Sequence, residues 1–214
     1  MKVAEALVQI LVKEGITDAF GIPGAGINPV YQYLETAPID HYCMRHEEAC
    51  THAADGYYRA CHKIALAICT SGPGATNFVT GVYTANIDSI PLLAITGQAK
   101  TWQLKMDVFQ CVDIAKICAP VAKKTYCLTE PADLPAVMRE AFYLMRSGKP
   151  GPVLLDLPLD VQMTEIEFDI DSYESIPVTK PAPDPAKIAE ALQMLDEAKA
   201  PAIIMGGGCT LAEC

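Results

Sequence analysis

Two hydrophobic patterns alternate along this chain. Short apolar runs rich in β-branched residues are followed by helix-length stretches in which apolar residues recur at helical spacing. This alternation is typical of βα units that build a parallel sheet. Two of the runs, IALAIC and PLLAIT, are almost continuously apolar, as in strands that are buried on both faces. The pattern predicts an α/β fold, a doubly wound and mainly parallel sheet with helices on both faces.

The same spacing predicts where the individual elements lie. The two most apolar strands, 64–69 and 90–96, are expected to be central in the sheet. The other strands are predicted over residues 18–22, 41–45, 124–128 and 153–157. Helices are predicted over residues 3–14, 28–35, 47–61, 74–86 and 132–146.

The pattern changes after Pro158 and predicts three parts. Residues 1–160 are expected to form the first domain. Residues 161–186 carry acids and closely spaced prolines without a helical period, so they are expected to be an extended linker across a domain surface. Residues 187–214 predict a helix at 187–198 and a strand at 201–205, the beginning of a truncated central domain.

Charge and cysteine usage narrow the class of protein. The net charge of −10 arises from 26 acidic against 16 basic residues with no long basic run, so nucleic acid and anionic membranes are not expected as partners. Charged and amide side chains interrupt the apolar N-terminus, which therefore predicts neither a signal peptide nor a membrane span. The cysteines lie in apolar or helical segments without a C-x-x-C pair, which favours reduced thiols in a cytoplasmic protein.

A glycine-rich segment, GIPGAG, follows the first predicted strand and precedes a helix. Bare backbone there can approach a ligand at the carboxyl end of the sheet. The spacing is not that of the dinucleotide fingerprint G-x-G-x-x-G, and the chain has no G-x-x-x-x-G-K-[ST]. A glycine-rich turn without a ligand is the alternative interpretation.

Two carboxylates, Glu47 and Glu48, stand where the second predicted strand leads into a helix. An open α/β sheet binds its ligands at this edge, so a carboxylate there is a candidate functional group. The alternative is that both acids only complement the helix dipole, which fits Glu48 better than Glu47. A zinc site at His46 and His52 is not expected, because H-E-x-x-H would need histidine where Cys50 stands.

Two further loops follow buried strands. The segment TSGPGATN (70–77) precedes a helix, with free N–H groups near the crevice. Its Ser71 is not a hydrolase nucleophile, because the flanking glycines of G-x-S-x-G are absent. The loop 97–110 is long for a βα connection, and such loops are usually functional or mobile. Ordinary α/β turns remain the alternative.

Taken together, these loops resemble the acetohydroxyacid synthase (acetolactate synthase) and glyoxylate carboligase branch of the thiamine-diphosphate enzymes. The resemblance runs nearly end to end and implies that family's N-terminal pyrimidine-binding domain. The motifs that carry it stand in the family's order: FGIPGAGINPVY, RHEEACTHAADGYYRA, TSGPGATN, DSIPLLAITGQ with DVFQCVDI, and SGKPGPVLLDLPLDVQ.

The resemblance implies a role for each candidate residue. A carboxylate close to N1′ of the aminopyrimidine switches the cofactor on, and Glu47 stands at that position. No residue of this chain is expected to bind a metal. By the same similarity, Gly24 and Ala25 would line the crevice, Thr70, Pro73 and Asn77 would bracket the pyrimidine, and Phe109 and Gln110 would face the substrate.

Cofactors and partners follow from the same resemblance. Thiamine diphosphate would bind here through its pyrimidine, while its diphosphate and Mg²⁺ would be held by a separate C-terminal domain. FAD accompanies several members of this branch, so the resemblance leaves both the presence and the absence of FAD as alternatives. The cofactor would lie between this domain and another protomer, which implies a homo-dimer or tetramer acting on small 2-oxo acids.

One residue separates the two candidate activities. Glyoxylate carboligases are expected to have an apolar residue in place of the activating glutamate, whereas this chain has Glu47, as acetolactate synthases do. Its tail, EIEFDIDSYESIPV, looks closest to glyoxylate carboligase. Two other hypotheses remain: the small subunit of a split 2-oxo-acid decarboxylase, and a non-catalytic module that works by pairing with a partner.

Overall fold

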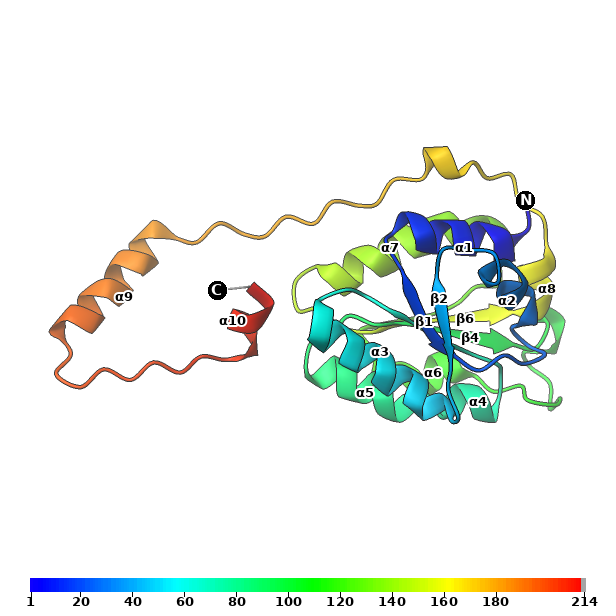
Figure 1. Cartoon of the computed structure of the whole chain (residues 1–214), viewed down its shortest axis with the longest axis horizontal. Helices are drawn as coiled ribbons and strands as arrows, with labels where there is room; N and C mark the ends of the chain where they lie inside the picture. The colour runs from blue at the N-terminus through cyan, green and yellow to red at the C-terminus, as the bar shows by residue number, and fades with distance from the viewer. Residues whose placement is uncertain (213–214) are drawn as a thin grey trace. The chain divides into compact units, whose positions relative to one another are not determined.

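The computed structural model describes residues 1–212 and divides the chain into two compact units. The first unit is Met1–Val178 and contains the whole sheet, and the second begins at Thr179 (Figure 1). The first unit therefore includes residues 161–178 of the predicted linker.

Six strands form one sheet in the order β2-β1-β3-β4-β6-β5, and every neighbouring pair is parallel. The predicted sheet is confirmed. β3 and β4 are buried at every position and stand inside the sheet, as their apolar sequences predicted. The strands are β1 Asp18–Gly21, β2 Asp40–Cys43, β3 Leu66–Cys69, β4 Leu93–Gln98, β5 Lys124–Cys127 and β6 Val153–Pro158.

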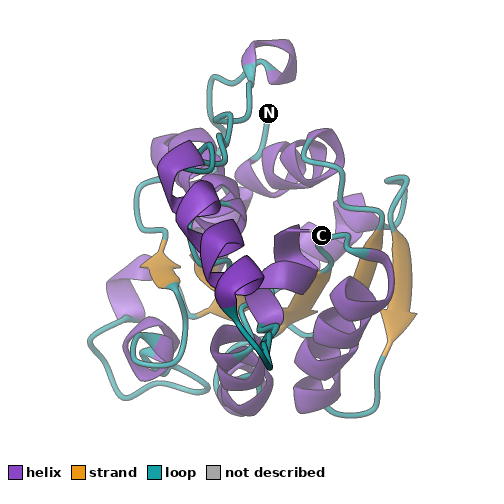
Figure 2. Ribbon diagram, turned by 90° about the vertical axis from the view of Figure 1, so that its left-hand side faces the viewer, coloured by secondary structure: helices purple, strands orange, loops and turns teal. Residues whose placement is uncertain are grey.

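Helices cover both faces of the sheet, so the fold is doubly wound. Figure 1 shows α1, α2, α7 and α8 over one face and α3, α4, α5 and α6 over the other, and Figure 2 shows helices on both sides of the strands. A separate apolar cluster fills each face, one around Leu7 and Phe142 and one around Phe78 and Val82. The helices are α1 Val3–Lys13, α2 Asn28–Leu34, α3 Glu47–Cys61, α4 Pro73–Thr76, α5 Val79–Ile87, α6 Ile114–Cys118, α7 Leu134–Arg146 and α8 Leu159–Met163.

The chain changes direction across the sheet between β1 and β3. From β1 it moves outward to β2 through α2, and from β3 it moves the other way to β4 through α4 and α5. The loops that leave these two neighbouring strands therefore diverge. In open α/β sheets, the crevice at such a switch point, outside the carboxyl ends of the strands, is where ligands bind.

Some predicted helices were wrong in detail. The single helix expected over 74–86 is two helices, α4 and α5, with Asn77 and Phe78 between them. Phe78 is fully buried, and the Asn77 side chain is hydrogen bonded to Glu47. Both residues between the two helices therefore make tertiary contacts. The short helices α6 and α8 were not predicted, because five residues span too little of the helical period to show it.

Residues 164–178 belong to the first unit and pack on it around the buried carboxylate of Glu14. The Glu14 carboxylate accepts hydrogen bonds from Arg146 Nη1 at 2.5 Å and from Tyr173 Oη at 2.7 Å. Tyr173 is fully buried, and the Arg139 guanidinium lies over its ring. The segment that looked like a surface linker thus packs on α1 and α7 through its one buried aromatic ring.

Residues 179–212 of the second unit contain two helices, α9 Pro185–Glu197 and α10 Gly207–Ala212. The helix expected at 187–198 is therefore present, but the strand expected at 201–205 is not formed. A strand needs a neighbour for its backbone hydrogen bonds, and the described residues of this unit include no other strand. Ile203, Ile204 and Met205 are exposed instead. No described helix in either unit is long and apolar enough to cross a membrane.

Replacing Glu14 with alanine is expected to destabilise the fold by about 1–3 kcal/mol, because it leaves the buried hydroxyl of Tyr173 without its acceptor. Urea unfolding of the chain measures the loss. Glu5→Ala, on the same helix and outside these contacts, is the control and should change the free energy of unfolding by less than about 0.5 kcal/mol. Equal effects of the two substitutions would contradict the role given to Glu14.

Candidate active site

The candidate residues gather at the carboxyl edge of the sheet. β1, β2, β3 and β4 are adjacent and parallel, so the segments that follow them emerge side by side. Glu47 follows β2, the glycine-rich segment 22–26 follows β1, and Thr70 follows β3. We number these loops by the strand that each one follows, from the first loop after β1 to the fourth loop after β4. The topology alone thus brings the first three loops to one crevice, and the fourth loop leaves β4 beside them.

Glu47 is the first residue of α3, and the helix start fixes its position. His46 precedes it in an extended conformation, and its Nδ1 accepts a hydrogen bond from the backbone N–H of Glu48 at 3.2 Å. This side-chain cap satisfies one of the free N–H groups at the helix start. The partial positive charge of that helix end favours the carboxylate of Glu47.

The two oxygens of the Glu47 carboxylate have different surroundings. Asn77 Nδ2 donates a hydrogen bond to Oε2 at 2.9 Å. Oε1 faces Gly74, where an added Cβ would lie 3.3 Å away. Among the described residues, no other hydrogen bond reaches this carboxylate, so Oε1 is available to a ligand. A half-buried carboxylate with one oxygen held and one available fits the ring nitrogen of an aminopyrimidine.

Two buried thiols lie beside this carboxylate. Burial and then the Glu47 charge raise the pKa of Cys50 to about 12. The pKa of Cys69 is also raised, by burial first and by the charges of Cys50 and Glu47 after it. Both thiols therefore stay protonated at neutral pH, and they serve as small apolar residues rather than as nucleophiles or metal ligands.

The first loop contacts the third loop at glycine residues. An added Cβ on Gly24 would lie 2.6 Å from the Cβ of Thr70, so only glycine fits there. The N–H of Gly26 donates to Thr70 Oγ1 at 3.1 Å, and the Gly26 carbonyl accepts from Gln162 Nε2 at 2.6 Å. An added Cβ on Gly97 would lie 2.3 Å from that same carbonyl oxygen. The loops after β1 and β3 and the end of β4 are therefore packed against one another, and the predicted loop 97–110 begins only after Gln98, because Gly97 and Gln98 belong to β4.

The fourth loop rests on the third through a pair of unusual backbone conformations. Gly72 has φ +66° and Gln110 has φ +55°. An added Cβ on Gly72 would lie 2.7 Å from the Cβ of Gln110, so the two residues are in direct contact. Phe109, next to Gln110, is 87% exposed. This loop thus carries a large aromatic side chain into solvent beside the crevice.

A buried polar network lies beneath the fourth loop. Asp156, on β6, accepts hydrogen bonds from Thr96 Oγ1 at 2.8 Å and from Gln98 Nε2 at 2.8 Å. All three side chains are at most 2% exposed, and Thr96 is the register partner of Asp156 in the neighbouring strand. Burial raises the pKa of Asp156 to about 7, against the effect of these hydrogen bonds.

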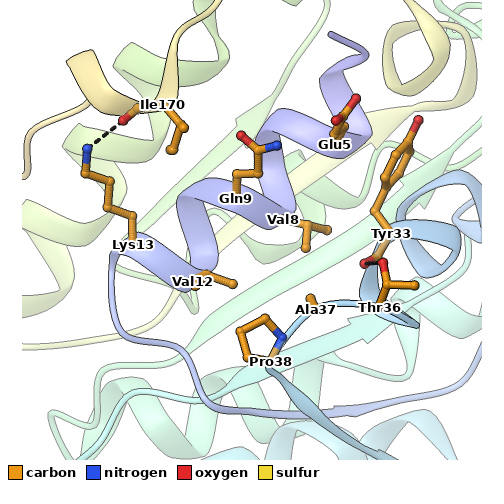
Figure 3. Close-up of a pocket in the computed structure, with 10 residues that line it drawn as sticks. All are labelled: Glu5, Val8, Gln9, Val12, Lys13, Tyr33, Thr36, Ala37, Pro38 and Ile170. Carbon is orange, nitrogen blue, oxygen red and sulfur yellow. Dashed lines mark hydrogen bonds between the residues drawn. The ribbon is translucent and has the colours of Figure 1, made fainter.

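A shallow groove lies away from this site. It has a volume of about 610 Å³ and runs between α1 and residues 33–38, as Figure 3 shows. The Lys13 ammonium at its rim donates to the Ile170 carbonyl at 2.5 Å. Lys13 and Pro38 precede β1 and β2, so this part of the groove belongs to the amino edge of the sheet, opposite the candidate loops.

The zinc alternative gains no support from the structure. His46 caps α3, and His52 lies 3.5 Å from the Glu48 carboxylate on the same helix. Over residues 1–212, no three histidine, cysteine or acidic side chains come together as a metal site.

Comparison with known proteins decides the family. Residues 1–117 match the family described as thiamine pyrophosphate enzyme, N-terminal TPP binding domain, where TPP is another name for thiamine diphosphate. The chain belongs to this family. The resemblance expected from the loops is confirmed, and the α/β sheet is that of the TPP-binding domain.

Three relatives show the branch of the TPP enzymes. The chain is 48% identical to the glyoxylate carboligase of Escherichia coli O157:H7, over all of this chain and 36% of that protein. It is 42% identical to an acetolactate synthase of Arthrospira platensis, over 98% of this chain and 38% of that protein. It is 41% identical to the acetolactate synthase large subunit of Corynebacterium glutamicum, over 98% of this chain and 34% of that protein. The chain thus spans about a third of the length of these TPP enzymes.

The structure brings most of the predicted residues of this TPP-family domain together. Glu47 and Asn77 are hydrogen bonded to each other, and Gly24 contacts Thr70. Gln110 joins them through Gly72. Ala25, Pro73 and Phe109 are exposed, and no contact ties them to the Glu47 carboxylate within the described residues.

Sequence reasoning missed Asp156, Gln98 and Thr96. A signal was present, because a carboxylate inside the apolar run VLLDLP must find hydrogen-bond donors if the strand is buried on both faces. The donors themselves lie in another strand, far away in the sequence, and only the strand register shows which residues they are.

The raised pKa of Asp156 predicts a pH-dependent stability. Between pH 3.8 and about 7 the folded chain keeps a proton on Asp156 that the unfolded chain loses, so this contribution is fully present at low pH and is lost as the pH rises to 7. Relative to Asp156→Asn, the wild type should lose up to about 4 kcal/mol of unfolding free energy over this range.

Urea unfolding of both proteins between pH 4 and 8 tests this. The exposed Asp107→Asn substitution is the control and should follow the wild-type profile. A constant difference between wild type and Asp156→Asn across the range would show that Asp156 does not titrate there.

Proposed function

We propose that this chain is the N-terminal domain of a thiamine-diphosphate-dependent 2-oxo-acid carboligase of the glyoxylate carboligase or acetolactate synthase type. Such an enzyme decarboxylates one 2-oxo acid and joins the product to a second carbonyl compound. The observation that carries the proposal is the Glu47 carboxylate at the switch-point crevice, with Oε2 held by Asn77 and Oε1 facing Gly74.

The residues of this chain act on the pyrimidine end of the cofactor. When bound, thiamine diphosphate supplies the nucleophile and the electron sink for decarboxylation and carbon–carbon bond formation. Glu47 holds a proton at N1′ of the aminopyrimidine through Oε1. Asn77 keeps the carboxylate in that orientation, because its amide donates to the other oxygen. Gly24 and Gly74 let the backbone of their segments approach Thr70 closely, since a Cβ would lie 2.6 Å from Thr70 Cβ at Gly24 and 3.2 Å from Thr70 Cγ2 at Gly74.

The remaining parts of the site are proposed to lie outside these residues. The diphosphate and Mg²⁺ would be held by a separate domain of another protomer, which makes a homo-dimer or tetramer the active form. FAD, where present, would bind mainly to the central domain that begins near residue 187. The relatives, of which this chain spans about a third, support this division.

Glyoxylate and pyruvate are the two candidate donor substrates. The 48% identity to a glyoxylate carboligase favours glyoxylate, whereas Glu47 favours acetolactate synthesis from pyruvate. The split decarboxylase is less consistent with residues 187–214, which such a small subunit would not need. An idle pairing module is less consistent with the hydrogen-bonded Glu47.

Glu47→Gln in the complete enzyme is expected to lower kcat/KM by about 10²- to 10⁴-fold, because the amide cannot exchange a proton with N1′. Exchange of the thiazolium C2 proton with solvent deuterium, followed by NMR, should slow in parallel. Glu48→Gln is the matched control, since Glu48 is the next residue but lies beside His52. If Glu47→Gln retained full exchange, the proposed activation would be wrong.

A product assay distinguishes the substrates. The complete polypeptide is supplied with thiamine diphosphate and Mg²⁺, and glyoxylate and pyruvate are fed separately. Mass spectrometry is expected to find tartronate semialdehyde from glyoxylate or acetolactate from pyruvate. The absence of any carboligation product from both substrates would favour the decarboxylase or the pairing module.

A further inference from the structure

Gln98 lies at the base of the fourth loop and binds both of its ends. Its Oε1 accepts from the backbone N–H of Ala99 at 2.8 Å, where the loop leaves β4. Its Nε2 donates to the carbonyl of Val112 at 2.7 Å, just before the loop enters α6. One buried side chain therefore joins the beginning of this loop to its end.

Asp156 supports the orientation of the Gln98 amide that Ala99 and Val112 require. The second N–H of Nε2 donates to Asp156 Oδ2 at 2.8 Å. If the amide were flipped, its oxygen would face both the carboxylate of Asp156 and the carbonyl of Val112, and its nitrogen would face the N–H of Ala99. These contacts would be unfavourable, so Ala99, Val112 and Asp156 together select a single orientation of the amide.

The loop held in this way carries Phe109 and Gln110 to the loop that follows β3. Gln110 rests directly on Gly72, in the loop that also carries Thr70 and Asn77. A shift at the loop base would therefore move Gln110 and its neighbour Phe109 relative to the crevice. A second attachment, from Thr101 to the carboxylate of Asp160, binds only the first part of the loop.

We propose that Gln98 and Asp156 are positioning residues, which act through the fourth loop to hold Phe109 and Gln110 at the substrate side of the site. The proposal rests on the proposed function, because it needs a substrate that meets this loop. Neither residue is hydrogen bonded to the Glu47 carboxylate among the described residues, since the partners of Gln98 are the Asp156 carboxylate on β6 and two backbone groups of the loop, at Ala99 and Val112. Loss of the pair is therefore expected to affect the substrate and to spare the cofactor.

The test uses the complete enzyme and the variant Gln98→Met, which keeps the length of the side chain and removes its amide. The KM for the 2-oxo acid is expected to rise about tenfold to a hundredfold, because small misplacements of positioning groups carry losses of this size. Thiamine diphosphate affinity and C2-proton exchange should stay at wild-type values. Asp156→Asn keeps the shape of the carboxylate and should give a smaller rise in KM.

The control is Val153→Ala, which removes packing from the same strand as Asp156 but lies at its other end. It should lower the melting temperature without raising KM. Wild-type KM in Gln98→Met, or a loss of cofactor affinity equal to the loss of substrate affinity, would overturn the proposal. Should Gln98→Met not fold, Asp156→Asn carries the same test.

These outcomes are separable from failure of the proposed function. If the complete wild-type enzyme formed no carboligation product, the proposed function would fail before any variant was compared. A different result would contradict only the positioning role. In that case the wild-type enzyme forms product and Glu47→Gln loses C2-proton exchange, which supports the proposed function, but Gln98→Met keeps a wild-type KM.

Discussion

Parallel pairing of the strands is the constraint on which the rest of this structure depends. Because all neighbouring strands run in the same direction, each loop that follows a strand emerges at the same edge. The order β2-β1-β3-β4 then makes the four candidate loops neighbours, although they are dispersed between residues 22 and 113. The apolar clusters on the two faces stabilise this arrangement, and the edge itself is free to carry polar groups.

Polar groups at this edge are held in two different ways. Glu47 is half-buried, and its carboxylate has one hydrogen-bonded oxygen and one available oxygen. Asp156 is fully buried, and both of its oxygens are occupied by Thr96 and Gln98. The carboxylate of Glu47 thus has an oxygen that a ligand can reach, whereas the carboxyl group of Asp156 is closed to ligands by its neighbours. The same chemical group has two different surroundings at one sheet edge, and burial separates them.

Sequence patterning predicted the parts of the fold that local signals determine. The six strands and the start of α3 at Glu47 followed from hydrophobic runs and their period, and the glycine-rich loops followed from their position after strands. The network around Gln98 was not predicted, because its partners meet only through the register of β4 with β6. The apolar run at 201–205 was wrongly read as a strand, because hydrophobicity alone cannot supply a neighbouring strand. The anchoring of residues 164–178 depends on Tyr173, a single aromatic residue that has no periodic pattern around it.

The contacts at Gly24, Gly72 and Gly97 have a consequence for how this site can change. At Gly24 and Gly72 the backbone of one loop touches another loop, and at Gly97 the end of β4 touches the loop after β1, with no space for a side chain in any of the three. The loops after β1, β3 and β4 therefore behave as one interlocked module, in which a longer or bulkier version of one loop would displace the other two. Variation in sequence should concentrate at exposed positions such as Phe109, because a new side chain there meets solvent rather than a neighbouring backbone. An exchange of loops between relatives would have to transfer all three together.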